Sequence, residues 1–385
     1  MTEKKSNRFK SVLWVMLLVI LTLPLIQAEF NIPIVPKVGG WSYKIPKPTF
    51  TLESYLNGEY QKNRDEYNRQ NVGYKRFFIK PYNQFYYSFF KEAKANSVII
   101  GKDNYLFETP YIDEYMGKSY IGYDSIRSKI QKLEKLNDTL QKKDIQLIVL
   151  LAPGKASFYP EFIPEQYDID KRTISNYQMY AQLLSKSSIS FLDFHRWFRR
   201  MKDTTSYPLF PKTGIHWSSY GEVLATDSLI RYLNNLDKIA QKIPSFEIIG
   251  IDISNKIKHR DDDIEKGMNL MFDIKDLVMA YPKFIINDNK EPNTIKVLTI
   301  ADSYYWGLYN MGLSKQAFGN GEFWFYNQQV FPERTKGPKM VQDLQLIKAV
   351  EKNDIILLLS TDATLHRFAF GFIDNLYEAY FKEKV

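Results

Sequence analysis

Cysteine is absent from the 385 residues of this chain, and histidine occurs only four times. The first absence excludes disulfide bonds, cysteine-ligated zinc and thiol catalysis together. The second limits any imidazole base to four positions. These are His195, His216, His259 and His366.

A nucleic-acid-binding signature is also missing. The net charge of +8 suits nucleic acid, an acidic polymer or an anionic membrane surface, but the lysines are scattered and form no basic stripe with interleaved aromatics. We therefore expect no nucleic-acid partner. Hydrophobic residues make up 44% of the chain and charged residues 25%, which indicates that most of it is globular.

Long apolar runs are scarce, and only Val12 to Ala28 approaches the length that spans a membrane. Four basic residues precede it: Lys4, Lys5, Arg8 and Lys10. A basic flank followed by an apolar run directs export and leaves the basic end in the cytoplasm. The run is either an uncleaved anchor or a signal peptide cut after Ala28, for which Ile26 is an unfavourable residue. In both cases the chain after Glu29 is expected outside the cytoplasm.

Composition divides the chain into three parts. Residues 1–30 are the cytoplasmic tip with the membrane anchor or signal. Residues 31–95 are a tether rich in proline and glycine, followed by a polar and aromatic segment that packs on the main domain. Residues 96–385 are expected to form the catalytic domain.

Residues 96–385 alternate between apolar strands and helices. After a short hairpin at 97–107, strands are predicted at 145–152, 189–192, 295–300 and 355–359, and helices at 126–140, 174–184, 223–233 and 341–350. This alternation predicts an α/β fold with a mostly parallel sheet covered by helices on both faces. Ligands bind at the carboxyl ends of strands in such sheets, so residues there are the first candidates for a site.

Residues 239–290 interrupt the alternation and carry the acidic cluster Asp261, Asp262 and Asp263. Such oxygen ligands can hold a hard metal ion. Arg260 lies beside them and cannot be a ligand, so we interpret the cluster as a solvated loop or a helix start. We expect no metal site and no cofactor.

Ser303 is the candidate nucleophile. The strand at 295–300 leads to Asp302 and Ser303, and a helix is expected to follow. A serine at a strand-to-helix turn has an exposed hydroxyl beside backbone N–H groups that can stabilise an oxyanion. The alternative is that Asp302 or Ser303 only caps the helix.

A serine nucleophile needs a base, and His216 is the best placed of the four histidines. It lies in a loop with Gly214 and Trp217, just before a helix that Ser219 and Glu222 are expected to cap. The alternative is a buried structural histidine.

Together these residues resemble the alginate O-acetyltransferase family of SGNH hydrolase-like proteins, the AlgX/AlgJ type, and most of all its AlgJ-like members. The resemblance runs from about Ser97 to Leu376. It rests on residues 101–108, 152–155 with 159–161, 214–217 and 302–303. His216 precedes Ser303, which fits the permuted motif order of this family. The resemblance implies an SGNH-like fold and acyl transfer by Ser303 and His216.

One position departs from the family pattern. Members carry an aspartate two residues before the histidine, where this chain has Gly214. Such an aspartate orients the imidazole and stabilises its protonated form. Three explanations are open: another carboxylate replaces it, with Asp193 after the strand at 189–192 as the candidate; a Ser303–His216 dyad is oriented by a backbone carbonyl; or the protein is a non-catalytic binding partner.

Three more residues are candidates for contact with substrate. Lys155 follows the strand at 145–152 and either contacts an anionic sugar or the oxyanion, or is a surface lysine. Tyr305 and Trp306 either form a stacking platform beside Ser303 or pack within the helix that follows it.

The resemblance implies transfer of acetyl groups to hydroxyls of a cell-surface or exported polysaccharide. It also implies an integral-membrane O-acyltransferase partner that brings the acyl group across the bilayer, and a location on the extracytoplasmic, periplasmic face of the inner membrane. A glycan O-acetylesterase using the same residues, and a non-catalytic glycan-binding or scaffold subunit of an acetylation complex, are the alternatives.

Overall fold

The computed structural model describes residues 2–30, 32, 34, 38, 39, 45–237, 239, 242–287, 295–333 and 337–382. The chain divides into two compact units, one of Met1–Asn96 with Glu265–Asp273 and one of Ser97–Ile264 with Ile274–Val385. Much of the tether predicted at residues 31–50 lies outside the described residues.

The first unit is helical. Helix α1 (Thr2–Phe30) contains the stretch Arg8–Phe30, whose 23 residues have a mean hydropathy of 2.3 and are long and apolar enough to cross a membrane. The helices α2 (Leu52–Leu56), α3 (Glu59–Asn71) and α4 (Lys75–Phe85) follow, and a π-helical turn continues α4. The single N-terminal apolar helix fits the predicted anchor or signal segment.

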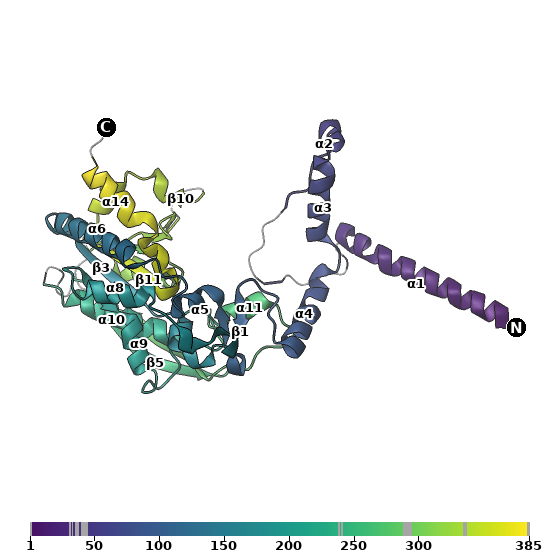
Figure 1. Ribbon diagram of the computed structural model, residues 1–385, viewed down its shortest axis with the longest axis horizontal. Coiled ribbons are helices and arrows are strands. Elements are labelled where there is room, and N and C mark those ends of the chain that lie inside the picture. The colour runs from purple at the N-terminus through teal and green to yellow at the C-terminus, as the bar shows by residue number, and fades with distance from the viewer. Residues whose placement is uncertain are drawn as a thin grey trace. The chain divides into compact units, whose positions relative to one another are not determined.

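The second unit is built on a seven-stranded sheet with the order β10-β9-β8-β7-β11-β3-β4. Figure 1 labels β3, β10 and β11 of this sheet. The bounds are β3 (Gln146–Ala152), β4 (Ser190–Asp193), β7 (Val297–Ala301), β8 (Phe323–Phe325), β9 (Gln329–Phe331), β10 (Lys339–Met340) and β11 (Ile355–Thr361). Neighbouring strands from β8 to β4 are parallel, and β9 and β10 extend the sheet in antiparallel fashion. The predicted α/β architecture with a mostly parallel sheet is confirmed.

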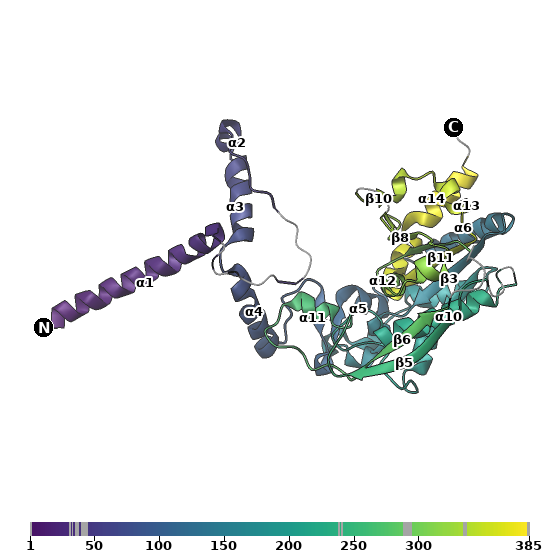
Figure 2. The same ribbon diagram turned by 180° about the vertical axis from the view of Figure 1, so that it is seen from behind.

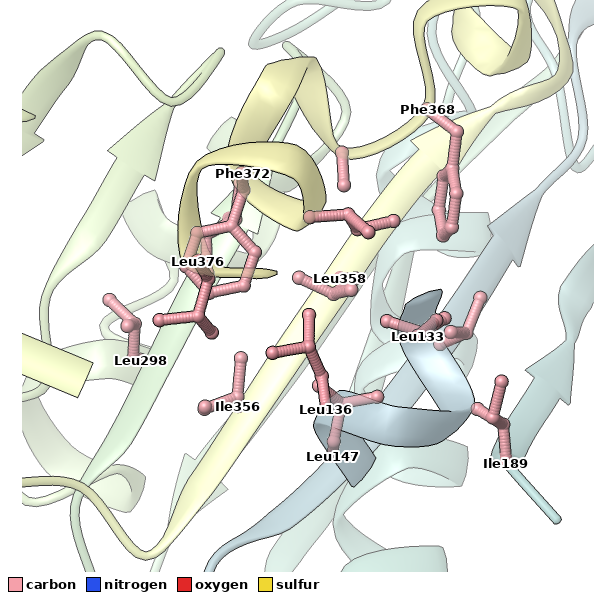
Figure 3. Packing of buried hydrophobic residues seen from close by; sticks show 14 of the residues in the cluster. Leu133, Leu136, Leu147, Ile189, Leu298, Ile356, Leu358, Phe368, Phe372 and Leu376 are labelled. Carbon is pink, nitrogen blue, oxygen red and sulfur yellow. The ribbon is translucent and has the colours of Figure 1, made fainter. Parts of the chain in front are cut away.

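One face of the sheet is covered by α6 (Tyr123–Gln141), α8 (Asn176–Leu184), α13 (Leu346–Glu351) and α14 (Phe372–Phe381). Figure 3 shows Leu298, Ile356 and Leu358 from the strands packing against Leu136 and Leu376 of the helices. Leu298 and Ile300 of β7 and Ile356 and Leu358 of β11 belong to this cluster, and the residues between them are also buried. Strands buried on both faces need apolar residues throughout, which explains their continuous apolar sequences.

The second unit also contains α5 (Thr109–Tyr115), α7 (Lys155–Phe158), α9 (Phe194–Met201), α10 (Ser219–Asn234) and α12 (Tyr305–Asn310). Helix α9 packs on β3, and α10 packs on α12. An antiparallel hairpin, β5 (Phe246–Ser254) and β6 (Met279–Ile286), lies against α10 (Figure 2). The short helix α11 (Asp263–Met268) falls between its two strands in the sequence.

Several local predictions are corrected. The helix expected at 341–350 is a 3-10 turn at Val341–Asp343 followed by α13. The hairpin β5–β6 occupies the segment that interrupted the sequence pattern, and the strands β8, β9 and β10 were not predicted. The hairpin expected at 97–107 is present as β1 (Val98–Ile100) and β2 (Leu106–Glu108).

Candidate active site

Ser303 lies at the carboxyl end of β7, in the turn that leads into α12. The buried carboxylate of Asp302 fixes this turn by accepting four hydrogen bonds. The donors are the backbone N–H groups of Tyr304 (3.0 Å) and Thr361 (2.7 Å) and the hydroxyls of Thr361 and Thr364 (2.8 Å each). Helix α12 has no side-chain cap, so Ser303 does not serve as one.

His216 lies in the loop between α9 and α10, and its Nε2 is 2.9 Å from Ser303 Oγ. The loop ends where Ser218 caps α10 by accepting a hydrogen bond from the Gly221 N–H (3.1 Å). The cap is therefore one residue earlier than the sequence predicted. The pairing of Ser303 with His216 brings together two elements that lie 87 residues apart in the chain.

Asp263 completes this chain of hydrogen bonds. Its Oδ2 pairs with His216 Nδ1, and its Oδ1 accepts a hydrogen bond from the Ile215 N–H (2.8 Å). Burial by itself raises the pKa of this carboxyl, but His216 and Arg260 outweigh burial and leave the pKa below its ordinary value. An ionised Asp263 holds the proton of the imidazole on Nδ1, which leaves Nε2 free to accept a proton from Ser303.

Arg260 lies against the imidazole of His216. A guanidinium nitrogen is 3.2 Å from Nε2 and 3.3 Å from Nδ1, and these nearly equal distances place it on the face of the ring. Asp261 is 3% exposed and accepts a hydrogen bond from the Ser219 N–H (3.0 Å) at the start of α10. The segment 260–263 therefore holds the base in place. Asp263 begins α11, as the helix-start interpretation expected, whereas Asp261 is buried and not solvated.

The loop that carries His216 is held from several sides. The ammonium of Lys155 donates to the carbonyls of Lys212 (2.6 Å) and Gly214 (2.7 Å). The Asp276 carboxylate accepts hydrogen bonds from the N–H groups of residues 212 (3.0 Å) and 213 (3.1 Å). The Tyr304 hydroxyl donates to the carbonyl of Ile215 (2.8 Å). A base fixed in this way needs little reorganisation during a reaction.

A cavity of about 520 Å³ opens above Ser303 and His216. Its other walls include Glu108, Tyr111, Tyr326, His366 and Arg367. Tyr326 lines this cavity together with Ser303, and its backbone adopts the left-handed region (φ 49°) just after β8. A non-glycine residue held in this conformation is uncommon and is often found at functional sites.

Asp193 does not orient His216. It caps α9 by accepting a hydrogen bond from the Arg196 N–H (2.8 Å), and it also accepts one from the Tyr177 hydroxyl. Strand β4, which ends at Asp193, is the third strand from β7 in the sheet. Strands are spaced about 4.8 Å apart, which puts their ends roughly 14 Å from one another. The carboxylate that contacts His216 is Asp263.

Tyr305 and Trp306 are packing residues, not a platform beside the nucleophile. Tyr305 is fully buried, and its hydroxyl hydrogen-bonds with Ser314 (2.9 Å). Trp306 packs edge-on against Phe323 and Phe331. The geometry therefore favours the alternative that the sequence left open for Tyr305 and Trp306, which is packing and not contact with substrate.

Lys155 is neither a surface lysine nor a group within the cavity. Its side chain is fully buried between the rings of Tyr105 and Phe107 and the carbonyls that it binds. Burial lowers the pKa of Lys155 from 10.5 to about 7, against the opposing charges of Asp276 and Asp263. Its position makes it a support for the His216 loop.

This lowered pKa has a measurable consequence for stability. Between pH 7 and 10.5 the unfolded chain binds the Lys155 proton and the folded chain has released it, so the free energy of unfolding rises with pH. The slope from one such group is at most about 1.4 kcal/mol per pH unit. We expect urea titrations to show that wild type gains stability over Lys155→Met as pH rises through this window. The exposed Lys186→Met serves as control, and a difference independent of pH would contradict the assignment.

Sequence reasoning missed Asp263, Arg260 and Tyr326. The acidic cluster beside an arginine was a visible signal, but its pairing with a loop 47 residues upstream depends on the tertiary fold. Tyr326 follows the three-residue strand β8, too short to stand out as a pattern. Within the described residues, no group of three or more His, Cys, Asp or Glu side chains is arranged to hold a metal ion.

Comparison with known proteins shows similarity to one family over part of the chain. Residues 98–245 match the family model described as SGNH hydrolase-like domain, acetyltransferase AlgX. The chain is 24% identical over 209 residues to a probable alginate O-acetylase AlgJ of Pseudomonas syringae pv. tomato, and the match covers 54% of this chain and 50% of that protein. A second relative of the same name, from Azotobacter vinelandii, is 24% identical over 143 residues, which cover 37% of this chain and 35% of that protein.

A solved structure is similar as well. The O-acetyltransferase domain of Pseudomonas putida AlgJ is 15% identical, with a TM-score of 0.45, over 74% of this chain and 99% of that domain. The chain spans about half or less of the length of the curated relatives that it matches. The predicted SGNH-like fold and the resemblance to AlgJ-like proteins are confirmed by the family model and the curated relatives.

Proposed function

From the SGNH hydrolase-like domain of the AlgX acetyltransferase type at residues 98–245, we propose that this chain is an O-acetyltransferase with Ser303 as its nucleophile. The observation that carries the proposal is the continuous hydrogen-bonded chain from Ser303 through His216 to Asp263. A nucleophile, a base and a group that orients the base are what serine-dependent acyl transfer requires.

The first half of the reaction forms an acyl-enzyme. Ser303 Oγ attacks the carbonyl carbon of an acyl donor while its proton passes to His216 Nε2. Asp263 stabilises the imidazolium that results. The tetrahedral intermediate then collapses, the donor oxygen takes the proton from His216, and the acyl group remains esterified to Ser303.

The second half transfers the acyl group. A sugar hydroxyl attacks the Ser303 ester as its proton passes to His216 Nε2, and Ser303 recovers that proton as it leaves. The products are an O-acylated sugar and the free enzyme. Hydrolysis by water follows the same steps, so the competition between water and sugar decides between transferase and esterase.

We assign Tyr326, which lines the cavity beside Ser303, as an oxyanion donor together with the Ser303 N–H. Burial raises the pKa of Tyr326, so its phenol keeps the proton that it has to donate. We expect Tyr326→Phe to lower kcat by a factor of about 10²–10³, the usual cost of removing one oxyanion donor. Steady-state kinetics with an activated acetyl ester measure this, with Tyr207→Phe as a control away from the cavity. A Tyr326→Phe enzyme with unchanged kcat would show that the phenol has no such role.

The substrate and setting of the proposed enzyme follow from its relatives and its first helix. Relatives named as probable alginate O-acetylases support a polysaccharide acceptor. An integral-membrane acyltransferase as the source of the acyl group is part of the proposal and rests on the family resemblance alone. The apolar stretch Arg8–Phe30 supports anchoring on the extracytoplasmic, periplasmic face of the membrane.

An activated acetyl ester tests the proposal directly. Mixing it with the full chain in detergent is expected to give a mass increase of one acetyl group, located at Ser303 by peptide mapping. Adding an oligosaccharide should then discharge the acyl-enzyme to acetylated sugar faster than water does. Discharge to acetate alone would identify an esterase, and the absence of any acyl-enzyme would favour the scaffold alternative.

A further inference from the structure

A second pocket, of about 300 Å³, lies where β4 leads into α9. Its lining is Tyr177, His195, Arg196, Arg199 and Arg200. None of these residues lines the cavity above Ser303, so the pocket is separate from the candidate active site. It has no part in the acyl-transfer chemistry proposed above.

A buried imidazole forms the inner end of this pocket. His195 is 2% exposed, and among the described residues neither of its ring nitrogens has a hydrogen-bond partner. The nearest acid is Asp362, whose Oδ2 lies 3.4 Å from His195 Nε2, and the ring of Tyr177 stacks on the imidazole with centroids 3.5 Å apart. Asp362 already offers an acceptor to Nε2, so Nδ1 is the ring nitrogen that lacks a polar partner. A buried polar atom without a partner is costly, and a ligand group at Nδ1 would remove that cost.

The outer wall is arginine from one face of α9. Phe194 and Phe198 turn inward and are buried, whereas Arg196, Arg199 and Arg200 are exposed. Residues three and four apart lie on the same side of a helix, so these guanidinium groups gather beside the pocket. Within the described part of the chain, none of the three forms an ion pair with a carboxylate. The pocket therefore gathers three guanidinium groups without ion-pair partners, while the carboxylates of Asp193 and Asp362 contact Tyr177 and His195 of its lining.

We propose that this pocket binds a phosphoryl group. Guanidinium groups bind oxyanions through paired N–H donors. Three guanidinium groups and an imidazole offer more donors than the two oxygens of a carboxylate can accept. A phosphate ester, with three terminal oxygens and up to two charges, uses this donor set more fully. A free phosphate ester and a phospholipid headgroup present the same chemistry.

Calorimetric titration of the full chain in nonionic detergent tests the site. The probes are inorganic phosphate, glycerol 3-phosphate and a short-chain phosphatidic acid, at constant ionic strength. We expect saturable binding by one site, weakened at least about tenfold by the pair Arg199→Gln and Arg200→Gln. Arg231→Gln is the matched control, because Arg231 is an exposed helical arginine whose partner is Asp227. It should leave binding unchanged.

The probes separate the two sources of the phosphoryl group. Equal affinity for glycerol 3-phosphate and phosphatidic acid would indicate a soluble ester. Tighter binding of phosphatidic acid that still depends on Arg199 and Arg200 would indicate a headgroup, and both results support the site. Absence of saturable binding by all three probes, or an equal loss in Arg231→Gln, would overturn it.

Discussion

Replacing either Ser303 or His216 with alanine is expected to abolish acyl transfer, and replacing both should cost little more than replacing one. The two side chains are 2.9 Å apart and act in the same proton transfer, so the second substitution removes a function already lost. We expect each single variant to lower kcat by a factor of about 10⁴ or more. The measurement is transfer of acetyl from an activated ester to an oligosaccharide.

The same cavity supplies a control for this experiment. His366 also lines it, but its Nδ1 hydrogen-bonds with the carbonyl of Ala363 (3.1 Å) and takes no part in the chain to Ser303. His366→Ala should therefore retain most of the turnover. Loss of folding is not expected in Ser303→Ala, because Asp302 and not Ser303 fixes the turn, and circular dichroism checks this. Multiplied losses in the double variant would mean that the two residues act independently.

The sheet was predictable where strands are buried on both faces. Residues 147–152 and 355–359 are continuously apolar because β3 and β11 are buried on both faces, and such runs are visible without any tertiary information. The strands β8, β9 and β10 are only two or three residues long, too short for a pattern to emerge. The hairpin β5–β6 exposes Ile249, Ile251 and Ile253. Because these apolar side chains face outward, the sequence pattern does not show which face of the hairpin packs on the core.

Local sequence predicted only part of the candidate site. Ser303 follows the central strand β7, and His216 lies just before the capped helix α10, so local sequence identifies both. Asp193 also follows a strand, but sequence does not give the order of strands in the sheet, and β4 is at the far edge from β7. Asp263 reaches His216 only through the folding of the segment after β5, which no local pattern specifies.

The second prediction of a large effect concerns Asp263. Asp263→Asn leaves a side chain of the same size but removes the charge that holds the Nδ1 proton and stabilises the imidazolium. We expect a loss in kcat of about 10⁴, the scale set by removing this group from a serine protease triad. Asp193→Asn is the matched control: asparagine caps a helix as well as aspartate does, and Asp193 does not contact His216. Near-normal turnover in Asp263→Asn would instead favour a dyad oriented by the backbone.

Placing the family's aspartate at Gly214 should not rescue that loss. A Cβ added at Gly214 would lie 2.6 Å from the carbonyl oxygen of Asp261 and 2.9 Å from Pro211 Cγ, closer than packed atoms allow. The Gly214 carbonyl also accepts a hydrogen bond from Lys155 (2.7 Å), so moving the backbone aside would break that support. We therefore expect Gly214→Asp to lower kcat in the wild-type background and to restore nothing in Asp263→Asn. A gain of turnover in either background would show that the loop can yield, and that position 214 can still carry the orienting carboxylate. The absence of a gain, with folding intact, would indicate that this chain has moved the carboxylate to the segment that packs against Gly214.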